Sequence, residues 1–416
     1  MQRPAGAQIS HGLKARGVEV IFGIPGVHNV EMYRGLEEAG ITHVLARHEQ
    51  GVGFMADGYA RATGKPGVGY VITGPGLLNT ATALGQAYSD SVPVLMLSSC
   101  LERVDLNANR GRLHDMRDQE AAGESVCAWS RTALDAQTAY DLIDRAFVEF
   151  QAARPRPVHI QVPIDVAAGL ADPMPAPNST VYRPAPHPNS FGDAVRMLKG
   201  STQPLVLIGG GAAGAPGPVR ALVEALGALS IPTYAGKGVV PDDAPLSLGA
   251  FLARPGSAQW LARADLVLVL GSELSETDLW RDALGHECPM IRVDLDARVL
   301  ADRYRAELCV LSDVGAFCDA VLPKIPKRSP AWSAEEVTGA RHRFRAEVDA
   351  ELPGILAWTD TLMEAVPEDT FFVSDMTQFA YKAKELCVLR APRRWIHPYG
   401  FGTLGYALPA AIGAKI

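Results

Sequence analysis

The sequence lacks the features that mark several classes of protein. Its 416 residues include only six cysteines, and no two of them form a C-x-x-C pair, which argues against a zinc ribbon or a disulfide framework. No apolar run reaches the roughly 18–20 residues that span a bilayer. The first twenty residues do not have the pattern of a signal peptide. We therefore expect a cytoplasmic protein with reduced thiols and no membrane partner.

An excess of positive charge is also missing. The chain has 39 Lys and Arg against 46 Asp and Glu, for a formal net charge of -7, so there is no electrostatic reason to expect nucleic acid as a partner. The hydrophobic share of 48% and the charged share of 20% are typical of a globular protein. The chain is too long to fold around one hydrophobic core, so its length predicts two or three domains.

The first part of the chain alternates short apolar runs with helical patterns. This alternation predicts βαβ units around a parallel sheet, whose ligands gather at the carboxyl ends of the strands. The strand-like runs are VEVIFG, THVLA, GVGYVIT, VPVLMLS and PVHIQVP, and the helical segments lie near residues 5–16, 28–39, 50–63, 76–88 and 137–153.

The rest of the chain forms two further blocks. A Pro-rich connector, DPMPAPNSTVYRPAPHPNS, leads to a second α/β block that ends near residue 323. The charged segment SAEEVTGARHRFRAEVDAEL then predicts a helix that serves as a surface linker. A third block begins near residue 351 with the strand-like runs TFFVSD and RRWIHP. It stops in a helix that has just begun, so we expect this block to be incomplete.

Three predicted strand ends carry residues that are suited to binding or catalysis. FGIPGVHN contains a tight turn and His28, RHEQ contains Glu49, and TGPGLLN contains the turn Gly74-Pro75-Gly76. Each has a plain structural explanation, because Glu49 could cap the helix that follows it and His28 could lie in an ordinary surface turn. The combination in one short stretch favours a site.

Two other motifs are weaker. GRLHDMRDQ gathers His114, Asp115, Asp118 and Gln119, but a solvated loop has the same composition. The turn LIGGGAAGAPG, with Asp294 further on, suggests a nucleotide site. The G-x-G-x-x-G spacing is absent, so we favour a close-packed turn over a nucleotide-dependent dehydrogenase.

Taken in order, these stretches resemble the thiamine diphosphate (ThDP) enzymes of the acetolactate synthase-like family. The resemblance rests on FGIPGVHN, RHEQGVGFMADGYARATGKPGV, TGPGLLN, YSDSVP and GFGTLGYALPAAIGAK. It implies three doubly wound α/β domains: pyrimidine-binding at 1–170, central at 190–325, and an incomplete diphosphate-binding domain at 350–416. The active site would form between two subunits, so a homodimer or homotetramer is expected.

The resemblance also implies an activity. It points to decarboxylation of a 2-oxo acid, with or without carboligation, and 5-guanidino-2-oxopentanoate is the expected substrate. Two alternatives stay open: an acetolactate synthase-type condensation of 2-oxo acids, and a non-catalytic binding subunit that has lost the metal site.

Site residues follow from the resemblance residue by residue. Glu49 matches the glutamate that bonds N1′ of the aminopyrimidine ring, and Leu404 matches the apolar residue that keeps the cofactor bent. Gly402 would offer its carbonyl to the 4′-amino group, and Gln378 would line the cleft. His28 and His114 would face the substrate as proton donors. Further cofactor contacts are expected at Gly26, Gly74, Pro75 and Asn79.

The sequence departs from the family at the metal site. Such enzymes anchor the diphosphate through Mg²⁺, with a GDG motif and a later Asn, and this motif is missing up to Ile416. We expect the metal site to follow Ile416 and the chain as given to bind ThDP poorly. FAD, which acetolactate synthases carry, is possible here but not favoured.

Overall fold

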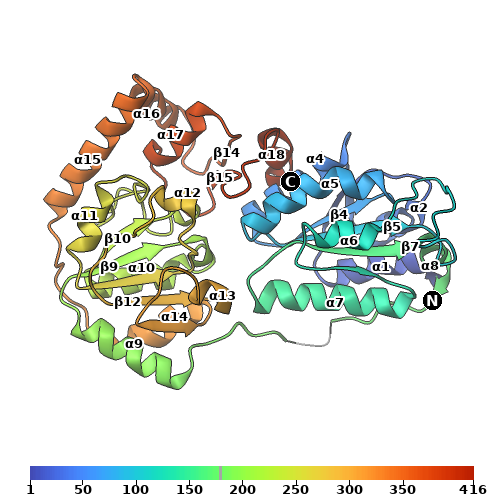
Figure 1. The fold of residues 1–416 in the computed structure, drawn as a ribbon, viewed down its shortest axis with the longest axis horizontal. Coiled ribbons are helices and arrows are strands. Elements are labelled where there is room, and N and C mark those ends of the chain that lie inside the picture. The colour runs from blue at the N-terminus through green and yellow to red at the C-terminus, as the bar shows by residue number, and fades with distance from the viewer. Residues whose placement is uncertain (178–179) are drawn as a thin grey trace. The chain divides into compact units, whose positions relative to one another are not determined.

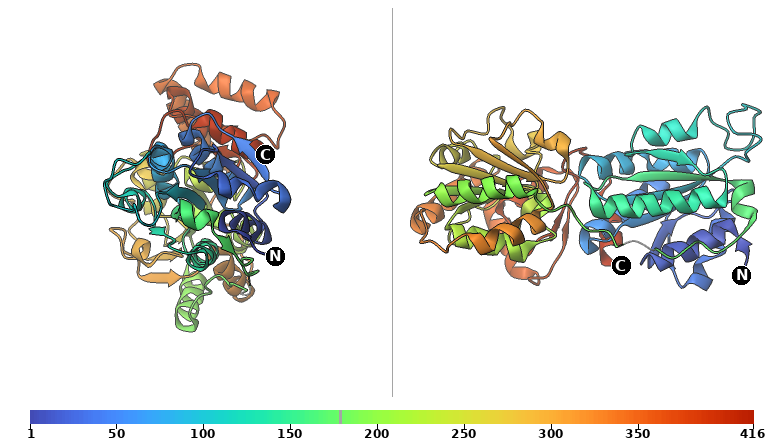
Figure 2. Two further views of the ribbon diagram at one scale, coloured as in Figure 1. Left: turned by 90° about the vertical axis from the view of Figure 1, so that its right-hand side faces the viewer. Right: turned by 90° about the horizontal axis from the view of Figure 1, so that it is seen from below.

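The computed structural model describes residues 1–177 and 180–416. They fall into two compact units: unit 1 comprises Met1–Tyr182 and Ile396–Ile416, and unit 2 comprises Arg183–Trp395. Each unit has a parallel sheet with helices on both faces (Figures 1 and 2). This confirms the predicted α/β fold class.

The sheet of unit 1 has the strand order β3-β2-β4-β5-β7-β6, and all neighbours are parallel. Five strands coincide with the predicted runs. The edge strand β6 was not predicted, because its sequence Ser-Arg-Thr has no apolar residue. The strands are β2 (Val20–Gly23), β3 (Thr42–Leu45), β4 (Gly67–Val71), β5 (Val94–Cys100), β6 (Ser130–Thr132) and β7 (Val158–Pro163).

Helices cover the two faces of this sheet with separate cores. Leu95 and Leu97 of β5 face the core shared with α1 and α7, whereas Val94 and Met96 face the core shared with α4 and α5. Burial on both faces explains the continuous apolar run of this strand. The helices are α1 (Ala5–Ala15), α4 (Glu49–Thr63), α5 (Pro75–Ser89), α6 (Gln119–Glu124), α7 (Ala136–Ala152), α8 (Ile164–Ala168) and α18 (Ala407–Lys415).

The prediction of one continuous helix over residues 28–39 is wrong. The segment is split into α2 (Val30–Tyr33) and α3 (Leu36–Ala39). Gly35 lies at the break, where a Cβ atom would come within 2.6 Å of the Ala7 carbonyl oxygen. The break therefore allows α1 to pack closely. Beside α1, β1 (Arg3–Pro4) pairs antiparallel with β8 (Leu170–Ala171).

Unit 2 has a second parallel sheet, in the order β10-β9-β11-β12-β13. Leu205 and Leu207 of β9 face one core, and Val206 and Ile208 face the other. The strands are β9 (Pro204–Ile208), β10 (Leu229–Pro232), β11 (Leu266–Leu270), β12 (Met290–Asp294) and β13 (Leu308–Leu311). The helices are α9 (Pro188–Gly200), α10 (Pro216–Leu226), α11 (Ser257–Ala262), α12 (Glu276–Leu279), α13 (Ala297–Leu300) and α14 (Val314–Val321), with 3₁₀ turns at Gly210–Ala212, Tyr234–Gly236 and Leu322–Lys324.

The glycine turn after β9 is a packing feature. A side chain at Gly209 would clash with the carbonyl oxygen of Gly271, which follows the neighbouring strand β11. The Gly211 N–H donates to that same oxygen at 3.0 Å. This geometry supports the close-packed turn that we favoured over a nucleotide site.

The charged segment after unit 2's sheet is the helix α15 (Ala334–Glu351), as predicted, but it is not a surface linker. Val337, Ala340, Phe344 and Val348 are all buried in a core of unit 2. Beyond it lie α16 (Ile355–Ala365), α17 (Gln378–Leu386) and a two-stranded sheet of β14 (Phe372–Val373) and β15 (Trp395–Ile396). None of the helices among the described residues is long and apolar enough to cross a membrane.

Candidate active site

The strand order of unit 1 creates a place for a ligand. After β2 the chain crosses to β3 on one side, and β4 then returns to the other side of β2. Such a switch leaves a crevice at the carboxyl ends of the strands. The turn with His28, the junction with Glu49 and the turn with Gly74 follow these three strands in order. Three predicted site segments therefore lie at one edge of the sheet.

Glu49 is the first residue of α4, but it does not provide the cap. The backbone N–H of Gln50 donates to Nδ1 of His48, which is the N-cap residue. The half-buried carboxylate of Glu49 instead accepts a hydrogen bond from Nδ2 of Asn79 at 2.8 Å. The capping explanation is therefore wrong, and two predicted site residues are brought together.

A third group, Tyr33 of α2, interacts electrostatically with Glu49. Its hydroxyl donates to the carbonyl of Tyr70 at 3.2 Å. Burial raises the pKa of Tyr33 well above its usual range, and Tyr70 and Glu49 add to the effect. Tyr33 is thus a neutral donor near Glu49. Sequence reasoning missed it, because a tyrosine in an apolar helical pattern looks like a core residue.

His28 and His114 come from distant parts of the sequence and meet edge to face, with ring centroids 5.0 Å apart. Burial lowers the pKa of His28, and the neighbouring His114 lowers it further, so His28 is neutral near pH 7. Nδ1 of each ring is buried and has no hydrogen-bond partner among the described residues. Such orphaned atoms are typical of positions that meet a ligand.

The glycine turns set the shape of this edge. Gly74 has φ +64°, and a Cβ atom there would lie 2.7 Å from the His114 carbonyl oxygen, so only glycine fits. Pro75 opens the first turn of α5, where its missing N–H costs nothing. A Cβ atom at Gly26 would lie 2.5 Å from Cδ1 of Ile72. Glycine is therefore required at position 74, whereas a side chain at position 26 would meet only the flexible end of Ile72.

Gln119, a weaker candidate from the sequence, holds the turn in place. Its Oε1 accepts from the Gly74 N–H at 2.7 Å, and its Nε2 donates to Ser98 Oγ and the Ser99 carbonyl. Behind it, His159 bonds Ser98 and Ser130. These contacts use both polar atoms of the Gln119 amide. They tie α6 to β5 and to the turn that follows β4.

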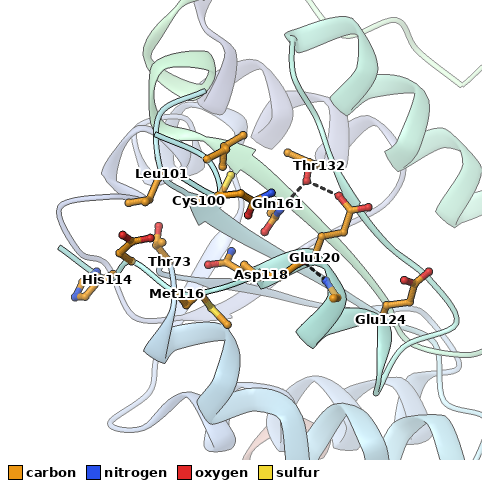
Figure 3. Close-up of a pocket in the computed structure, with 15 residues that line it drawn as sticks. Thr73, Cys100, Leu101, His114, Met116, Asp118, Glu120, Glu124, Thr132 and Gln161 are labelled. Carbon is orange, nitrogen blue, oxygen red and sulfur yellow. Dashed lines mark hydrogen bonds between the residues drawn. The ribbon is translucent and has the colours of Figure 1, made fainter. Parts of the chain in front are cut away.

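A pocket of about 300 Å³ is lined in part by His114, one member of the histidine pair (Figure 3). Its deep side is formed by buried groups, and burial raises the pKa of the Cys100 thiol so that it stays protonated. The lining contains four carboxylates and no Lys or Arg. Its residues are Thr73, Cys100, Leu101, Leu106, Asn107, His114, Asp115, Met116, Asp118, Gln119, Glu120, Ala121, Glu124, Thr132 and Gln161.

The predicted residues Gly402 and Leu404 lie in the last segment of unit 1. Asp90, just after α5, accepts hydrogen bonds from the N–H groups of Tyr399 and Gly400 at 3.0 and 2.8 Å. Gly402 has φ +70°, and the side chain of Leu404 is 70% exposed. An exposed leucine in a fixed loop offers an apolar surface to a ligand.

Helix α18 continues this segment and packs on α4. A side chain at Gly58 would clash with the carbonyl of Ala410, and one at Gly413 would clash with that of Met55. Nearby, Arg61 pairs with Asp57 at 2.6 Å and with Asp90 at 2.8 Å, and the Tyr406 hydroxyl donates to Asp57. Glu49, Asn79, Gly402 and Leu404 thus belong to one compact unit.

Gln378, the remaining predicted site residue, belongs to unit 2. It is the first residue of α17 and is exposed, and the preceding Thr377 caps the helix by accepting from the Ala380 N–H. Within residues 1–177 and 180–416, no three His, Cys, Asp or Glu side chains gather in a way that could hold a metal ion.

Comparisons with known proteins indicate the family of the chain. Three family models match in order: thiamine pyrophosphate enzyme, N-terminal TPP binding domain (residues 3–122), central domain (191–321) and C-terminal TPP binding domain (375–416). The chain is 44% identical to the probable 2-ketoarginine decarboxylase AruI of Pseudomonas aeruginosa, over 99% of this chain and 74% of that protein.

The chain belongs to the family of thiamine pyrophosphate enzymes.

Other relatives of this ThDP enzyme are acetolactate synthases. The isozyme 1 large subunit of Escherichia coli is 29% identical over 100% of this chain and 75% of the relative. The acetolactate synthase of Arthrospira platensis is 30% identical, over 97% and 73%. The dehydrogenase alternative is therefore wrong. The N-terminal TPP binding match includes Glu49, Asn79 and both histidines, and the C-terminal match includes Gln378, Gly402 and Leu404.

The residues of unit 1 fit the cofactor of the family. Glu49 has one carboxylate oxygen held by Asn79, which leaves the other for a ring nitrogen. Leu404 offers an exposed apolar side chain, and the orphaned histidine nitrogens offer polar contacts. The three predicted domain boundaries stay predictions, since the two compact units divide the chain differently.

Proposed function

We propose that the protein decarboxylates a 2-oxo acid with ThDP, and that its substrate is 5-guanidino-2-oxopentanoate, which is 2-ketoarginine. The observation that carries the decarboxylation is Glu49, held by Asn79 at the strand ends of unit 1. The substrate assignment is supported by the 44% identity to a protein named as a 2-ketoarginine decarboxylase.

Each site residue has a role in this proposal. When bound, ThDP supplies the electron sink that takes up the charge left by departing CO₂. Glu49 holds a proton at N1′ of the pyrimidine ring, and Asn79 orients its carboxylate. Leu404 would support the bound cofactor with its exposed side chain, and Gly402 would leave room for the pyrimidine ring beside its carbonyl. Gly26, Gly74 and Pro75 shape the turns around it.

His28 and His114 manage protons around the substrate. A neutral imidazole can donate to a developing alkoxide and return a proton to the carbon that has lost CO₂. The lowered pKa of His28 keeps it neutral, so no positive charge is buried beside the pocket before substrate binds. The reaction consumes one proton, breaks the C1–C2 bond, and releases CO₂ and 4-guanidinobutanal.

The proposal includes Mg²⁺ as the ion that anchors the diphosphate. It also includes a homodimer or homotetramer as the assembly. Mg²⁺ requires hard oxygen ligands, and phosphate oxygens are ligands of this kind. FAD is not needed for this chemistry, and a colourless purified protein is expected.

The test is a panel of 2-oxo acids given to the natural protein with ThDP and Mg²⁺. Release of CO₂ and 4-guanidinobutanal from 5-guanidino-2-oxopentanoate supports the proposal. Acetolactate from pyruvate, with no reaction of the guanidino acid, supports the alternative favoured by the acetolactate synthase relatives. If the protein binds ThDP but turns over none of these acids, the result supports the alternative of a non-catalytic binding subunit.

A further inference from the structure

The pocket beside the histidine pair has a charge pattern that the proposed reaction does not itself explain. Decarboxylation acts on a 2-oxo carboxylate, which is an anion. This pocket is instead lined by Asp115, Asp118, Glu120 and Glu124, and Lys and Arg are absent from its lining. An anionic substrate group would be repelled here, whereas a cation would be attracted.

Hydrogen bonds inside the protein use only part of these carboxylates. Asp118 Oδ1 accepts from the Ala121 N–H at 3.0 Å, and Asp115 Oδ2 accepts from the Gly111 N–H at 3.2 Å. Asp115 Oδ1 is buried without a partner among the described residues. Arg131 pairs with Glu124 at 3.1 Å and approaches Glu120 at 3.7 Å, so this side of the pocket is partly neutralised.

Gln161 gives an independent sign of a ligand. It is only 4% exposed, on β7 at the deep side of the pocket (Figure 3). Its Nε2 donates to Thr132 Oγ1 at 2.6 Å, and its Oε1 is buried without a hydrogen-bond partner in the described part of the chain. A buried amide oxygen left without a donor is costly, so a donor from a ligand is expected to reach it.

We propose that this pocket binds the guanidinium group of the substrate, with Asp115, Asp118 and the Gln161 amide oxygen as acceptors. A guanidinium is planar and carries five N–H donors, which matches several acceptors on different sides. The assignment deepens the proposed function and rests on it for the identity of the substrate.

The position of the pocket suits that role. Gly74, whose N–H is held by the pocket residue Gln119, is the N-cap residue of α5. From Pro75, the first residue of α5, to Asn79 the helix rises roughly 6 Å, at about 1.5 Å per residue. Five bonds separate the keto carbon of the substrate from its guanidinium carbon, roughly 6 Å when extended. One end of the molecule can thus enter the pocket while the other stays near the cofactor residues.

The test compares the guanidino substrate with its neutral isostere, 5-ureido-2-oxopentanoate, in the natural protein with ThDP and Mg²⁺. The variants are Asp118→Asn, which keeps a capping oxygen, and Asp115→Asn. We expect kcat/KM for the guanidino acid to fall roughly 10- to 100-fold in each, with little change for the ureido acid. The control, Glu37→Gln, removes an exposed carboxylate of α3 and should leave both values unchanged.

A binding measurement separates this inference from the proposed function. Calorimetric titration with 4-guanidinobutanoate and 4-ureidobutanoate needs no turnover. Preferential binding of the guanidino compound that is lost in Asp118→Asn supports the pocket, even if no 2-oxo acid is decarboxylated and the proposed function falls. Equal binding of both compounds, or an undiminished preference in both variants, overturns the pocket assignment, even if decarboxylation is observed.

Discussion

Glu49 and its neighbour His48 divide two tasks between them. The imidazole caps α4, and the carboxylate is left to Asn79 and to a ligand. In a carboxylate that served as the cap, the backbone N–H donors would stabilise the charged form and oppose protonation. The division keeps Glu49 available for proton exchange.

This division predicts the behaviour of Glu49→Gln. The variant keeps a hydrogen-bond acceptor for Asn79 but cannot exchange a proton, so kcat should fall roughly 10²- to 10⁴-fold. The melting temperature should stay close to that of the wild type, because the cap is provided by His48. Steady-state kinetics and thermal unfolding check both statements, and a kcat within a few-fold of the wild type would refute the role.

His159 predicts a pH dependence of stability. It is fully buried, and burial lowers its pKa from 6.5 to about 3. Below pH 6.5 the unfolded state therefore binds more protons than the folded state. The free energy of unfolding is thus highest above this pH and falls by about 1.4 kcal/mol per pH unit as the pH decreases towards 3.

The measurement is urea denaturation of wild type and His159→Asn between pH 7 and about pH 5. His28 and His43 also have lowered pKa values and contribute to the wild-type slope, so the difference between the two proteins isolates His159. Parallel curves for the two proteins would contradict the prediction.

At the scale of elements, the contact between α4 and α18 depends on glycines. The clash of a Cβ atom at Gly58 with the Ala410 carbonyl predicts that Gly58→Ala lowers the free energy of unfolding by about 1–3 kcal/mol and loosens α18. Thermal unfolding and limited proteolysis of the 396–416 segment measure both effects.

Gly192→Ala is the matched control. Gly192 lies inside α9, and a Cβ atom there would meet nothing within 4 Å. Alanine should be neutral or stabilising by up to about 1 kcal/mol. Equal effects of the two substitutions would show that close packing of α4 and α18 is not what Gly58 provides.

Much of the architecture could be predicted from local patterns. The parallel strands of unit 1 are buried on both faces, so each appears as an apolar run of the right length. The edge strand β6 could not be found in this way, since pairing with β7, rather than its own polar sequence, makes it a strand. Helix α15 was assigned to the surface because its many charges obscure the buried stripe of Val337, Ala340, Phe344 and Val348.

The candidate site was predictable only in part. Glu49, His28 and Gly74 follow strands directly, so their meeting at one sheet edge could be expected. The pairing of Glu49 with Asn79, and of His28 with His114, depends on tertiary contacts that no local pattern encodes. Gln161 lies inside a strand, and nothing in its sequence neighbourhood sets its orphaned oxygen apart from other strand residues.

At the scale of the whole molecule, α18 carries an exposed apolar surface that suits the interface of the expected homo-oligomer. Leu408 and Ile412, four residues apart on α18, are 75% and 43% exposed, and Leu404 precedes them. Exposed apolar residues at this spacing form one stripe on a helix. The protein should sediment at twice the monomer mass or more, and Leu408→Glu should shift it towards the monomer. A monomeric wild type at micromolar concentration would contradict this prediction.

The return of residues 396–416 to unit 1 also has a consequence for how the protein is made. A ribosome releases residues 1–182 long before α18, so the surface of α4 around Met55 and Gly58 must wait for the whole of unit 2 to be synthesised. During that interval Asp57 lacks the Tyr406 hydroxyl and Asp90 lacks the N–H groups of Tyr399 and Gly400. Unit 2 is continuous in sequence and can fold before α18 packs on α4.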